Sequence, residues 1–383
     1  MAKNYVKRQA RRSAKKVAKK HPVLAIILVI VFVCALVGGY FAYKKLTDKT
    51  LPITGELSFH FMMLGNDNAG DSIYVKAGDN DILIDAGSRD DSIDDIKKYV
   101  DQYVTDGKLE YVIATHADQD HIAGFAKTDG SIFDLYECEV IIDFPLTEKT
   151  TATYSRYLDE RADEVKNGAK HFTALQCYNQ SVDGALREYS LTEDGSVKME
   201  ILYNYYYDHD AKDENDYSVC LMFHHGDRKF LFTGDLEESG EQKLAEKYDF
   251  TQVELYKAGH HGSKTSSNDC LLREIKPKMS VVTCCAGSVE YTQTFANTFP
   301  TQAYIDRISV YTDKVYVPIY VDVQFNTAKD KYENVTEYGL LNGNIVVTSN
   351  KDKGVYAECS NNNTLLKDTE WFKENRVCPA NWA

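Results

Sequence analysis

The sequence predicts a layered α/β fold in which two sheets lie between outer helices, preceded by a single transmembrane helix. Strand-like and helix-like segments alternate after residue 56, in two similar halves that each begin with a strand meander. Ahead of them, residues 23–42 contain no charged side chain, and a helix of that length spans the roughly 30 Å hydrocarbon core of a bilayer. The composition, 43% hydrophobic and 27% charged, excludes a disordered or multi-span membrane chain.

The charge of the chain is divided between its two ends. The 383 residues carry a net charge of −14, but residues 1–49 hold twelve basic side chains and one acidic side chain. That segment is therefore +11 and the rest of the chain is −25. Nine of the basic residues precede the apolar segment, which predicts a cytoplasmic N-terminus and a body outside the cell membrane. A cleaved signal peptide is the alternative, although its apolar stretch is usually shorter.

Five segments are predicted along the chain: a basic cytoplasmic tail at residues 1–22, a transmembrane helix at 23–43, a linker at 44–56, one large domain at 57–360 and a C-terminal tail at 361–383. None of the eight cysteines outside the predicted span forms a C-x-x-C zinc or redox motif. Because an extracytoplasmic body permits disulfides, Cys359 and Cys378 are the expected pair.

The large domain is predicted from short strands and amphipathic helices. In its first half, strands are expected at residues 57–64, 72–75, 81–84, 111–115 and 139–143, and helices at 90–104 and 152–167. In its second half, strands are expected at 197–203, 217–223, 229–233, 252–257, 279–283, 344–348 and 354–358, and helices at 236–248, 268–275 and 302–311. The strands are short apolar runs bounded by turn residues. The helices place apolar residues at helical spacing, as Ile93, Ile96 and Val100 do.

The strongest local signal is the run His-Ala-Asp-Gln-Asp-His at residues 116–121, directly after an apolar strand. It places four possible metal ligands within six residues. Nitrogen and oxygen donors at this density suit one or two divalent cations. A single histidine here would usually be a polar loop residue, but four ligand-type side chains together argue against that interpretation.

Three further strands also end in polar residues. Asp85 and Asp235 each follow an apolar strand, and the pair His260 and His261 follows another and leads into a loop of small residues. Open α/β folds build their sites from strand ends at one edge of a sheet. We therefore expect these side chains to meet residues 116–121.

In this order the motifs resemble the metallo-β-lactamase fold, and they are most similar to the C-terminal metallo-β-lactamase-like domain of bacterial competence DNA-uptake channel proteins. The shared patterns are a Gly-Asp hairpin, an I-D-x-G strand end, an H-x-[HD]-x-D-H loop, an N-x-x-S strand, a T-G-D strand end and a G-H-H-G-S-K-T-S loop. They match residues 70–75, 84–87, 116–121, 215–220, 233–235 and 259–266. The resemblance covers residues 57–358 and implies an αββα four-layer sandwich.

The resemblance also implies two divalent metal ions, zinc or manganese. The implied ligands are His116 and Asp118 for the first ion, Asp120, His121 and His260 for the second, and Asp235 between them. The implied catalytic residues are Asp120, Asp85, His261 and Lys264, and Asp85 is expected to orient His116.

Three positions depart from the pattern of the wider fold. Asp118 stands where many relatives have histidine, which favours manganese or magnesium over zinc without excluding zinc. A histidine ligand between the two halves is absent from residues 215–218. The nearby histidines, each expected to be a surface or turn residue and otherwise a candidate for the missing ligand, are His209, His224 and His225. Relatives often have Gly-His-Pro where this chain has Thr-Phe-Pro at residues 298–300, so a substrate-contacting histidine is missing.

The loop after the histidine pair is expected to contact a phosphate group. Ser263, Lys264 and Thr265 precede a helix that begins near Asn268. Free amides at the start of a helix, with a lysine beside them, suit a phosphate. An ordinary capped loop is the alternative interpretation.

Together, these features predict a membrane-anchored, extracytoplasmic hydrolase that uses a dinuclear metal-activated hydroxide on a phosphodiester, with nucleic acid among its candidate substrates. The charge of −25 on the body opposes general binding of a long polyanion. One alternative is hydrolysis of another bond or a small substrate, such as an envelope phosphoester, a lactam, a lactone or a thioester. Another is a non-catalytic surface module in which the metals are structural.

Overall fold

The computed structural model describes residues 50–335 and 338–383. The predicted cytoplasmic tail, the transmembrane helix and the first part of the linker lie outside the described residues. In the part of the chain that is described, no helix has the length and apolar character needed to cross a membrane.

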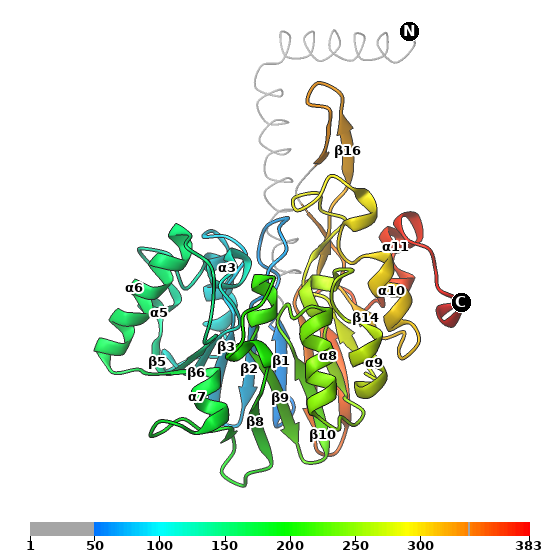
Figure 1. The fold of residues 1–383 in the computed structure, drawn as a ribbon. Coiled ribbons are helices and arrows are strands. Elements are labelled where there is room, and N and C mark those ends of the chain that lie inside the picture. Colours follow the sequence, from blue (N-terminus) through cyan, green and yellow to red (C-terminus); the bar gives the residue numbers. More distant parts are fainter. Residues whose placement is uncertain (1–49, 336–337) are drawn as a thin grey trace, which may run out of the picture. The chain divides into compact units, whose positions relative to one another are not determined.

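The described residues form two main sheets that lie face to face (Figure 1). The first sheet has eight strands, in the order β20 (Gly354–Cys359), β19 (Ile345–Asn350), β1 (Leu57–Phe61), β2 (Ile73–Ala77), β3 (Asn80–Ile84), β4 (Lys108–Ala114), β5 (Glu137–Asp143) and β6 (Lys170–Thr173). The second sheet has seven strands, in the order β14 (Val315–Tyr316), β12 (Ser280–Val281), β11 (Leu255–Lys257), β10 (Arg228–Phe232), β9 (Cys220–His225), β8 (Val197–Leu202) and β7 (Glu188–Ser190).

Helices cover the outer faces of both sheets. The helices of the described residues, not all of which lie on these faces, are α3 (Ser92–Val100), α4 (Gln119–Ile122), α5 (Ile132–Leu135), α6 (Ala152–Asn167), α7 (Ala174–Asn179), α8 (Glu238–Lys247), α9 (Asp269–Ile275), α10 (Gln302–Ile308) and α11 (Glu370–Asn375). Figure 1 shows α3, α5 and α6 on the side of the first sheet and α8, α9 and α10 on the side of the second. The predicted layering of helix, sheet, sheet and helix is therefore confirmed.

Each sheet begins as an antiparallel meander and continues as parallel strands. In the first sheet β1, β2 and β3 are antiparallel, whereas β3, β4, β5 and β6 are parallel. In the second sheet β8, β9 and β10 are antiparallel, whereas β10, β11, β12 and β14 are parallel. Parallel neighbours have their carboxyl ends at the same edge of a sheet, so the residues that follow β3 and β4 emerge together, as do those that follow β10 and β11.

Aromatic rings fill the space between the two sheets. Phe59 of β1 is fully buried, and its ring centroid lies 5.2 Å from Phe223 of β9 and 5.0 and 5.1 Å from Phe230 and Phe232 of β10. Rings at these separations contribute to stability beyond the area that they bury. This packing fixes the distance between the edges that carry the polar strand ends.

Two features of the C-terminal part differ from the sequence-based expectations. The expected disulfide between Cys359 and Cys378 is absent: both are free thiols, because Cys359 is buried in β20 whereas Cys378 is exposed beyond α11. Residues 361–383, predicted to be a tail, pack into the second half of the domain. Their buried apolar side chains are Leu366, Trp371, Phe372 and Trp382.

Two small sheets lie between β12 and β19 in the sequence, where no strand was predicted. One contains β13 (Cys285–Ala286), β15 (Ile319–Tyr320) and β18 (Gly339–Leu340). The other is a hairpin of β16 (Val323–Asn326) and β17 (Lys331–Asn334), which projects away from the two main sheets in Figure 1. The strands of the first are only two residues long, which is too short for a periodic pattern in the sequence.

A buried histidine should make the stability of the fold depend on pH. His60 of β1 is fully buried, with Nε2 2.9 Å from Ser58 Oγ and Nδ1 2.9 Å from the Tyr99 hydroxyl of α3. Burial lowers the pKa of His60 to about 3. Because this pKa lies below that of the unfolded chain, the folded state loses stability as the pH falls below about 6.5, by about 2 kcal/mol at pH 5.

Urea unfolding of the full chain at pH 7.5 and pH 5 measures this effect. His60→Gln keeps hydrogen-bonding groups but removes the titration, so we expect it to lose less stability than the wild type between the two pH values. The exposed His209→Gln is the control and should behave like the wild type. Equal losses in the wild type and His60→Gln would contradict this explanation.

Candidate metal centre

The polar residues that follow four strands meet at one edge of the two sheets. Asp85 follows β3, residues 116–121 follow β4, Asp235 follows β10 and His261 follows β11. The structure therefore brings together residues that are up to 176 positions apart. Gly87 permits the close approach of two of these segments, since a Cβ there would lie 1.5 Å from the carbonyl oxygen of Asp120.

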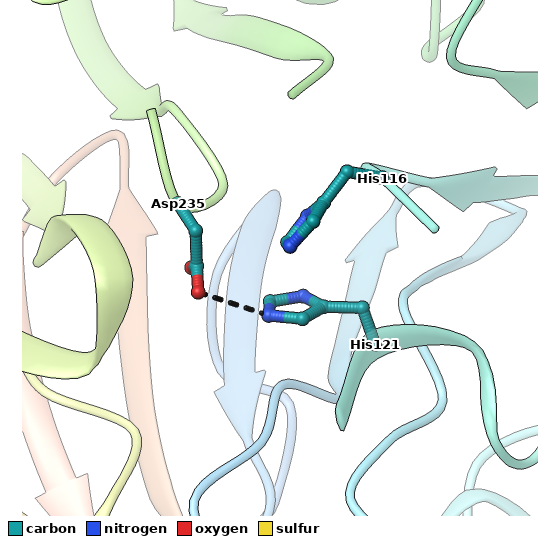
Figure 2. A group of neighbouring side chains, drawn as sticks. All are labelled: His116, His121 and Asp235. Carbon is teal, nitrogen blue, oxygen red and sulfur yellow. Dashed lines mark hydrogen bonds and ion pairs between the residues drawn. The ribbon is translucent and has the colours of Figure 1, made fainter. Parts of the chain in front are cut away.

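His121 stands between two carboxylates. Its imidazole is fully buried, and Nδ1 lies 2.7 Å from Asp85 Oδ2. The Asp85 carboxylate also accepts hydrogen bonds from the backbone N–H and the hydroxyl of Thr115, both at 2.7 Å. These contacts hold a proton on Nδ1, so Nε2 faces Asp235 Oδ2 at 3.2 Å (Figure 2).

The expected partner of Asp85 was His116, and the structure corrects this. The backbone N–H of Ala86 donates to the carbonyl oxygen of His121 at 2.8 Å, which sets Asp85 beside His121. His116 instead has its Nδ1 3.1 Å from the Thr115 hydroxyl. Asp85 therefore reaches His116 only through Thr115.

His116 offers a free nitrogen to the same space. Burial, with a contribution from the His121 ring, lowers the pKa of His116 to about 4, so its imidazole is neutral. Its Nε2 is buried and has no hydrogen-bond partner. A buried polar atom without a partner costs free energy unless an ion or water satisfies it. Figure 2 shows His116, His121 and Asp235, whose ligand atoms all lie within 4.8 Å of one another.

Of the histidine pair, His261 joins the cluster. Both histidines have positive φ, 45° and 53°, and this left-handed turn directs the two rings differently. His261 is buried; its Nδ1 donates to the Thr283 carbonyl oxygen at 2.8 Å, and its Nε2 lies 3.2 Å from Asp235 Oδ2. His260 is partly exposed, with Nδ1 3.5 Å from Glu237 Oε1. Among the described residues, the groups that could hold a metal contain His261 and not the expected His260.

Asp120 completes a second group. Its ligand atom and those of His121 and His261 also lie within 4.8 Å of one another, and its carboxylate is 3.5 Å from His261 Nε2. The two groups share His121, whose only free ring nitrogen is Nε2, so they describe overlapping positions for a metal ion.

Asp118 lies beside the cluster without joining these groups. Its Oδ2 is 3.7 Å from His116 Nε2, and its other oxygen pairs with the Lys149 ammonium. Among the described residues, no further histidine supplies a ligand beside His116 and Asp118. The three candidates contact other groups: His209 contacts Asp208, His224 contacts Glu200 and His225 contacts Ser349.

The charges of the cluster suit a cation at its centre. Asp235 Oδ2 lies 3.2 Å from Nε2 of both His121 and His261, while their Nδ1 atoms face Asp85 and the Thr283 carbonyl. Burial opposes a charge on either ring, but the carboxylates outweigh it and raise the pKa of both histidines well above the ordinary value. The space therefore attracts protons or a metal cation. Three imidazoles and two carboxylates fit divalent zinc or manganese.

A buried lysine and aspartate behind the cluster were not identified from the sequence. Lys257, at the end of β11, is 1% exposed, and its ammonium lies 2.5 Å from Asp71 Oδ2 and 3.3 Å from Asp235 Oδ1. Asp71 also lies 3.4 Å from His261 Nδ1. The ammonium holds one oxygen of Asp235 and leaves the other facing the histidines. Two features of the sequence could have indicated this pair: the lysine within an otherwise apolar strand, and the Gly-Asp hairpin at residues 70–75.

The expected phosphate contact at the loop of residues 262–267 is not supported by the geometry. The backbone N–H groups of Ser267 and Asn268, at the start of α9, donate to the buried carboxylate of Glu241 at 2.5 and 2.8 Å. A protein carboxylate therefore already takes the place of the expected anion. Lys264 is exposed, with its ammonium 3.2 Å from Asn297 Oδ1. The hydroxyl groups of Ser263 and Thr265 form a hydrogen bond with each other at 3.0 Å.

An aromatic wall that includes Phe299 of the Thr-Phe-Pro segment borders the cluster. The Phe299 ring lies 5.8 Å from His260 and 5.9 Å from His261. The Tyr291 ring lies 6.0 Å from Phe299, and its hydroxyl is 3.1 Å from Asp120 Oδ2. The wall places apolar surface beside the cluster and one hydroxyl within reach of it.

Known proteins match this chain over most of the segments that build the site. The sequence model of the Metallo-beta-lactamase superfamily matches residues 65–187 and 209–285, slightly more than half of the chain. The solved structure of the metallo-beta-lactamase fold protein YhfI from Bacillus subtilis is 13% identical, covers 68% of this chain and 85% of that one, and has a TM-score of 0.37.

Two relatives confirm the resemblance to competence proteins. ComE operon protein 3 of Bacillus subtilis (strain 168) is 27% identical over 177 residues, which are 46% of this chain and 20% of that protein. Competence protein ComA of Neisseria gonorrhoeae is 33% identical over 106 residues, which are 27% of this chain and 14% of that protein. The matched part of this chain thus spans a fifth or less of each relative.

The two neighbouring histidines should differ sharply in metal binding. We expect His261→Ala to weaken binding by at least the roughly 10–100-fold that the loss of an outer partner costs a metal site. His260→Ala should bind the metal nearly as tightly as the wild type does, because the His260 ring lies at the margin of the cluster and contacts Glu237. Calorimetric titration of the full chain with Mn²⁺ or Zn²⁺ measures both. A larger loss for His260→Ala would refute the assignment of His261.

Lys257 should stabilise the metal-free protein by compensating two buried carboxylates. In chelator, Lys257→Met should lower the free energy of unfolding by about 3–5 kcal/mol, because Asp71 and Asp235 are left without their cation. Adding Asp71→Asn should recover part of this loss. Lys278→Met, which removes a half-exposed pair with Glu254, is the control and should cost at most about 1 kcal/mol. Equal losses in the two lysine variants would show that Lys257 has no such role.

Proposed function

This chain belongs to the metallo-beta-lactamase superfamily, and on that premise we propose that it is a membrane-anchored, metal-dependent phosphodiesterase that acts on nucleic acid outside the cytoplasm. The observation that carries the proposal is the buried cluster in which His116 Nε2 has no hydrogen-bond partner and His261 Nε2 faces the Asp235 carboxylate at 3.2 Å. Imidazole nitrogens and carboxylate oxygens arranged in this way are a metal-binding donor set.

The residues that would hold one or two zinc or manganese ions are His116, Asp120, His121, Asp235 and His261. When bound there, a divalent ion supplies a Lewis acid for the phosphoryl oxygen and a strongly nucleophilic water at neutral pH. The chain itself supplies orientation: Asp85 and the Thr283 carbonyl fix the tautomers of His121 and His261.

Two cations beside the cluster support an anionic substrate. The Lys149 ammonium pairs with Asp118, and the Arg89 guanidinium pairs with Glu290. Each can turn toward a phosphate that enters between them.

Two further considerations support the rest of the proposal. The similar proteins are named ComE operon protein 3, competence protein ComA and, in Haemophilus influenzae, Recombination protein 2. The names of the last two support DNA as the substrate. The uncharged residues 23–42 and the basic residues before them support the membrane anchor and the outer location.

Hydrolysis of bis-p-nitrophenyl phosphate by the full chain tests the activity. With Mn²⁺ or Zn²⁺ we expect turnover that chelator abolishes, and we expect Asp120→Ala to lower kcat by about 100-fold or more while the protein stays folded. Asp352→Ala, at an exposed carboxylate, is the matched control and should be fully active.

A substrate panel separates the competing reactions. If the fully metal-loaded protein hydrolyses a lactam or a thioester and neither bis-p-nitrophenyl phosphate nor DNA, the phosphodiesterase proposal fails. Unchanged turnover in Asp120→Ala would also refute it, since that carboxylate belongs to the proposed ligand set.

A further inference from the structure

The exposed aromatic side chains of the described residues are concentrated in one region. They are Tyr291, Phe325 and Tyr332, with exposed fractions of 46%, 47% and 38%. All three lie in the loop of residues 288–299 or in the β16–β17 hairpin, and we call these two segments together the aromatic arm. Exposed aromatic surface has a hydration cost. Its concentration in one region indicates a binding surface.

Hydrogen bonds join the two segments of the aromatic arm into one unit. The backbone N–H of Tyr332 donates to Gln293 Oε1 at 2.7 Å. The backbone N–H of Val289 donates to Asn334 Oδ1 at 3.1 Å, and Asn334 Nδ2 donates to the Ser288 hydroxyl at 3.1 Å. These bonds tie both the middle and the base of the hairpin to the loop.

The rings of the aromatic arm extend outward in sequence. Tyr332 lies 6.3 Å from Phe295 of the loop and 5.2 Å from Phe325 on the neighbouring strand, measured between ring centroids. Figure 1 shows that the hairpin, labelled β16, projects away from the main sheets. A ligand that follows the hairpin therefore meets several rings in turn.

At its base, the aromatic arm adjoins the metal centre. The Tyr291 hydroxyl donates to Asp120 Oδ2 at 3.1 Å, and its ring lies beside Phe299, which packs on His261. Contact with two residues of the candidate ligand set makes the arm a continuation of that site. This continuity favours a substrate over a membrane surface as its occupant.

The charges of the hairpin show how it would hold a polymer. The ammonium groups of Lys329 and Lys331 lie 2.7 and 3.8 Å from Glu333 Oε1, so these cations are paired. The hairpin thus offers ring faces more than free positive charge. Unpaired bases stack on such rings, whereas a duplex keeps its bases stacked on one another.

We propose that the aromatic arm binds the unpaired bases of a single nucleic-acid strand and thereby presents an adjacent phosphodiester to the metal centre. This rests on the phosphodiesterase function proposed above and names its substrate class. Binding depends on stacking, so it should prefer a single strand to the same sequence as a duplex, and should weaken less with added salt than binding carried by several phosphate contacts.

Binding of a fluorescent oligothymidylate to the full chain in mild detergent and chelator tests the proposal without cleavage. We expect Phe325→Ala combined with Tyr332→Ala to weaken binding about 10-fold or more, since each stacked base contributes about 1–3 kcal/mol. Tyr332→Phe, which keeps the ring, and Val310→Ala, an exposed apolar control, should bind as the wild type does. The Val310→Ala control should also keep wild-type turnover of bis-p-nitrophenyl phosphate.

Phe325→Trp distinguishes nucleic acid from a lipid surface. The two native tryptophans are buried, so the new indole reports on the aromatic arm. Oligothymidylate should quench it, and vesicles of phosphatidylcholine and phosphatidylglycerol should leave it unchanged. A response to vesicles alone, no binding by the wild type, or equal binding by the double variant would overturn the proposal. Failure of the loaded wild type to hydrolyse any phosphodiester would instead refute the proposed function.

Discussion

The buried carboxylate of Asp235 must be compensated by positive charge, and the structure around it is arranged to meet this requirement. It is 1% exposed, and the free energy of burying a charge is prohibitive unless cations compensate it. Lys257 holds Oδ1 at 3.3 Å, and the Nε2 atoms of His121 and His261 lie 3.2 Å from Oδ2. With both Nδ1 atoms held by other partners, this arrangement is satisfied only when positive charge, a proton or a metal, lies between the rings and the carboxylate.

The fold meets this requirement through its parallel strand pairs. β3 with β4, and β10 with β11, deliver their following residues to one place, and the aromatic core between the sheets sets the separation of the two halves. Asp71 enters from the first half and contacts Lys257 and His261 of the second. The same contacts that prepare a metal site therefore also join the two halves of the domain, so function and stability are coupled there.

Much of this could be predicted from the sequence because strand ends with ligand-type residues are local patterns. The layers, the run at residues 116–121 and the place of Asp235 follow from such patterns. Neighbouring residues in a turn were harder to tell apart: the left-handed conformation at His260 and His261, and not their order, decides which ring faces inward. Long-range partners had no local signal. Examples are Asp85 with His121 and Glu241 with the amides of α9, where the buried carboxylate replaced the expected phosphate.

Anomalous X-ray diffraction from crystals of the protein soaked in Mn²⁺ tests the central claim most directly. A metal centre built around Asp235 predicts an anomalous peak within bonding distance of Asp235 Oδ2 and of Nε2 of at least two of His116, His121 and His261. Lys257 should remain on the other carboxylate oxygen. A map from manganese-saturated crystals with no peak at this place, or with the ion held by His260 on the outer side of the turn, would contradict the account.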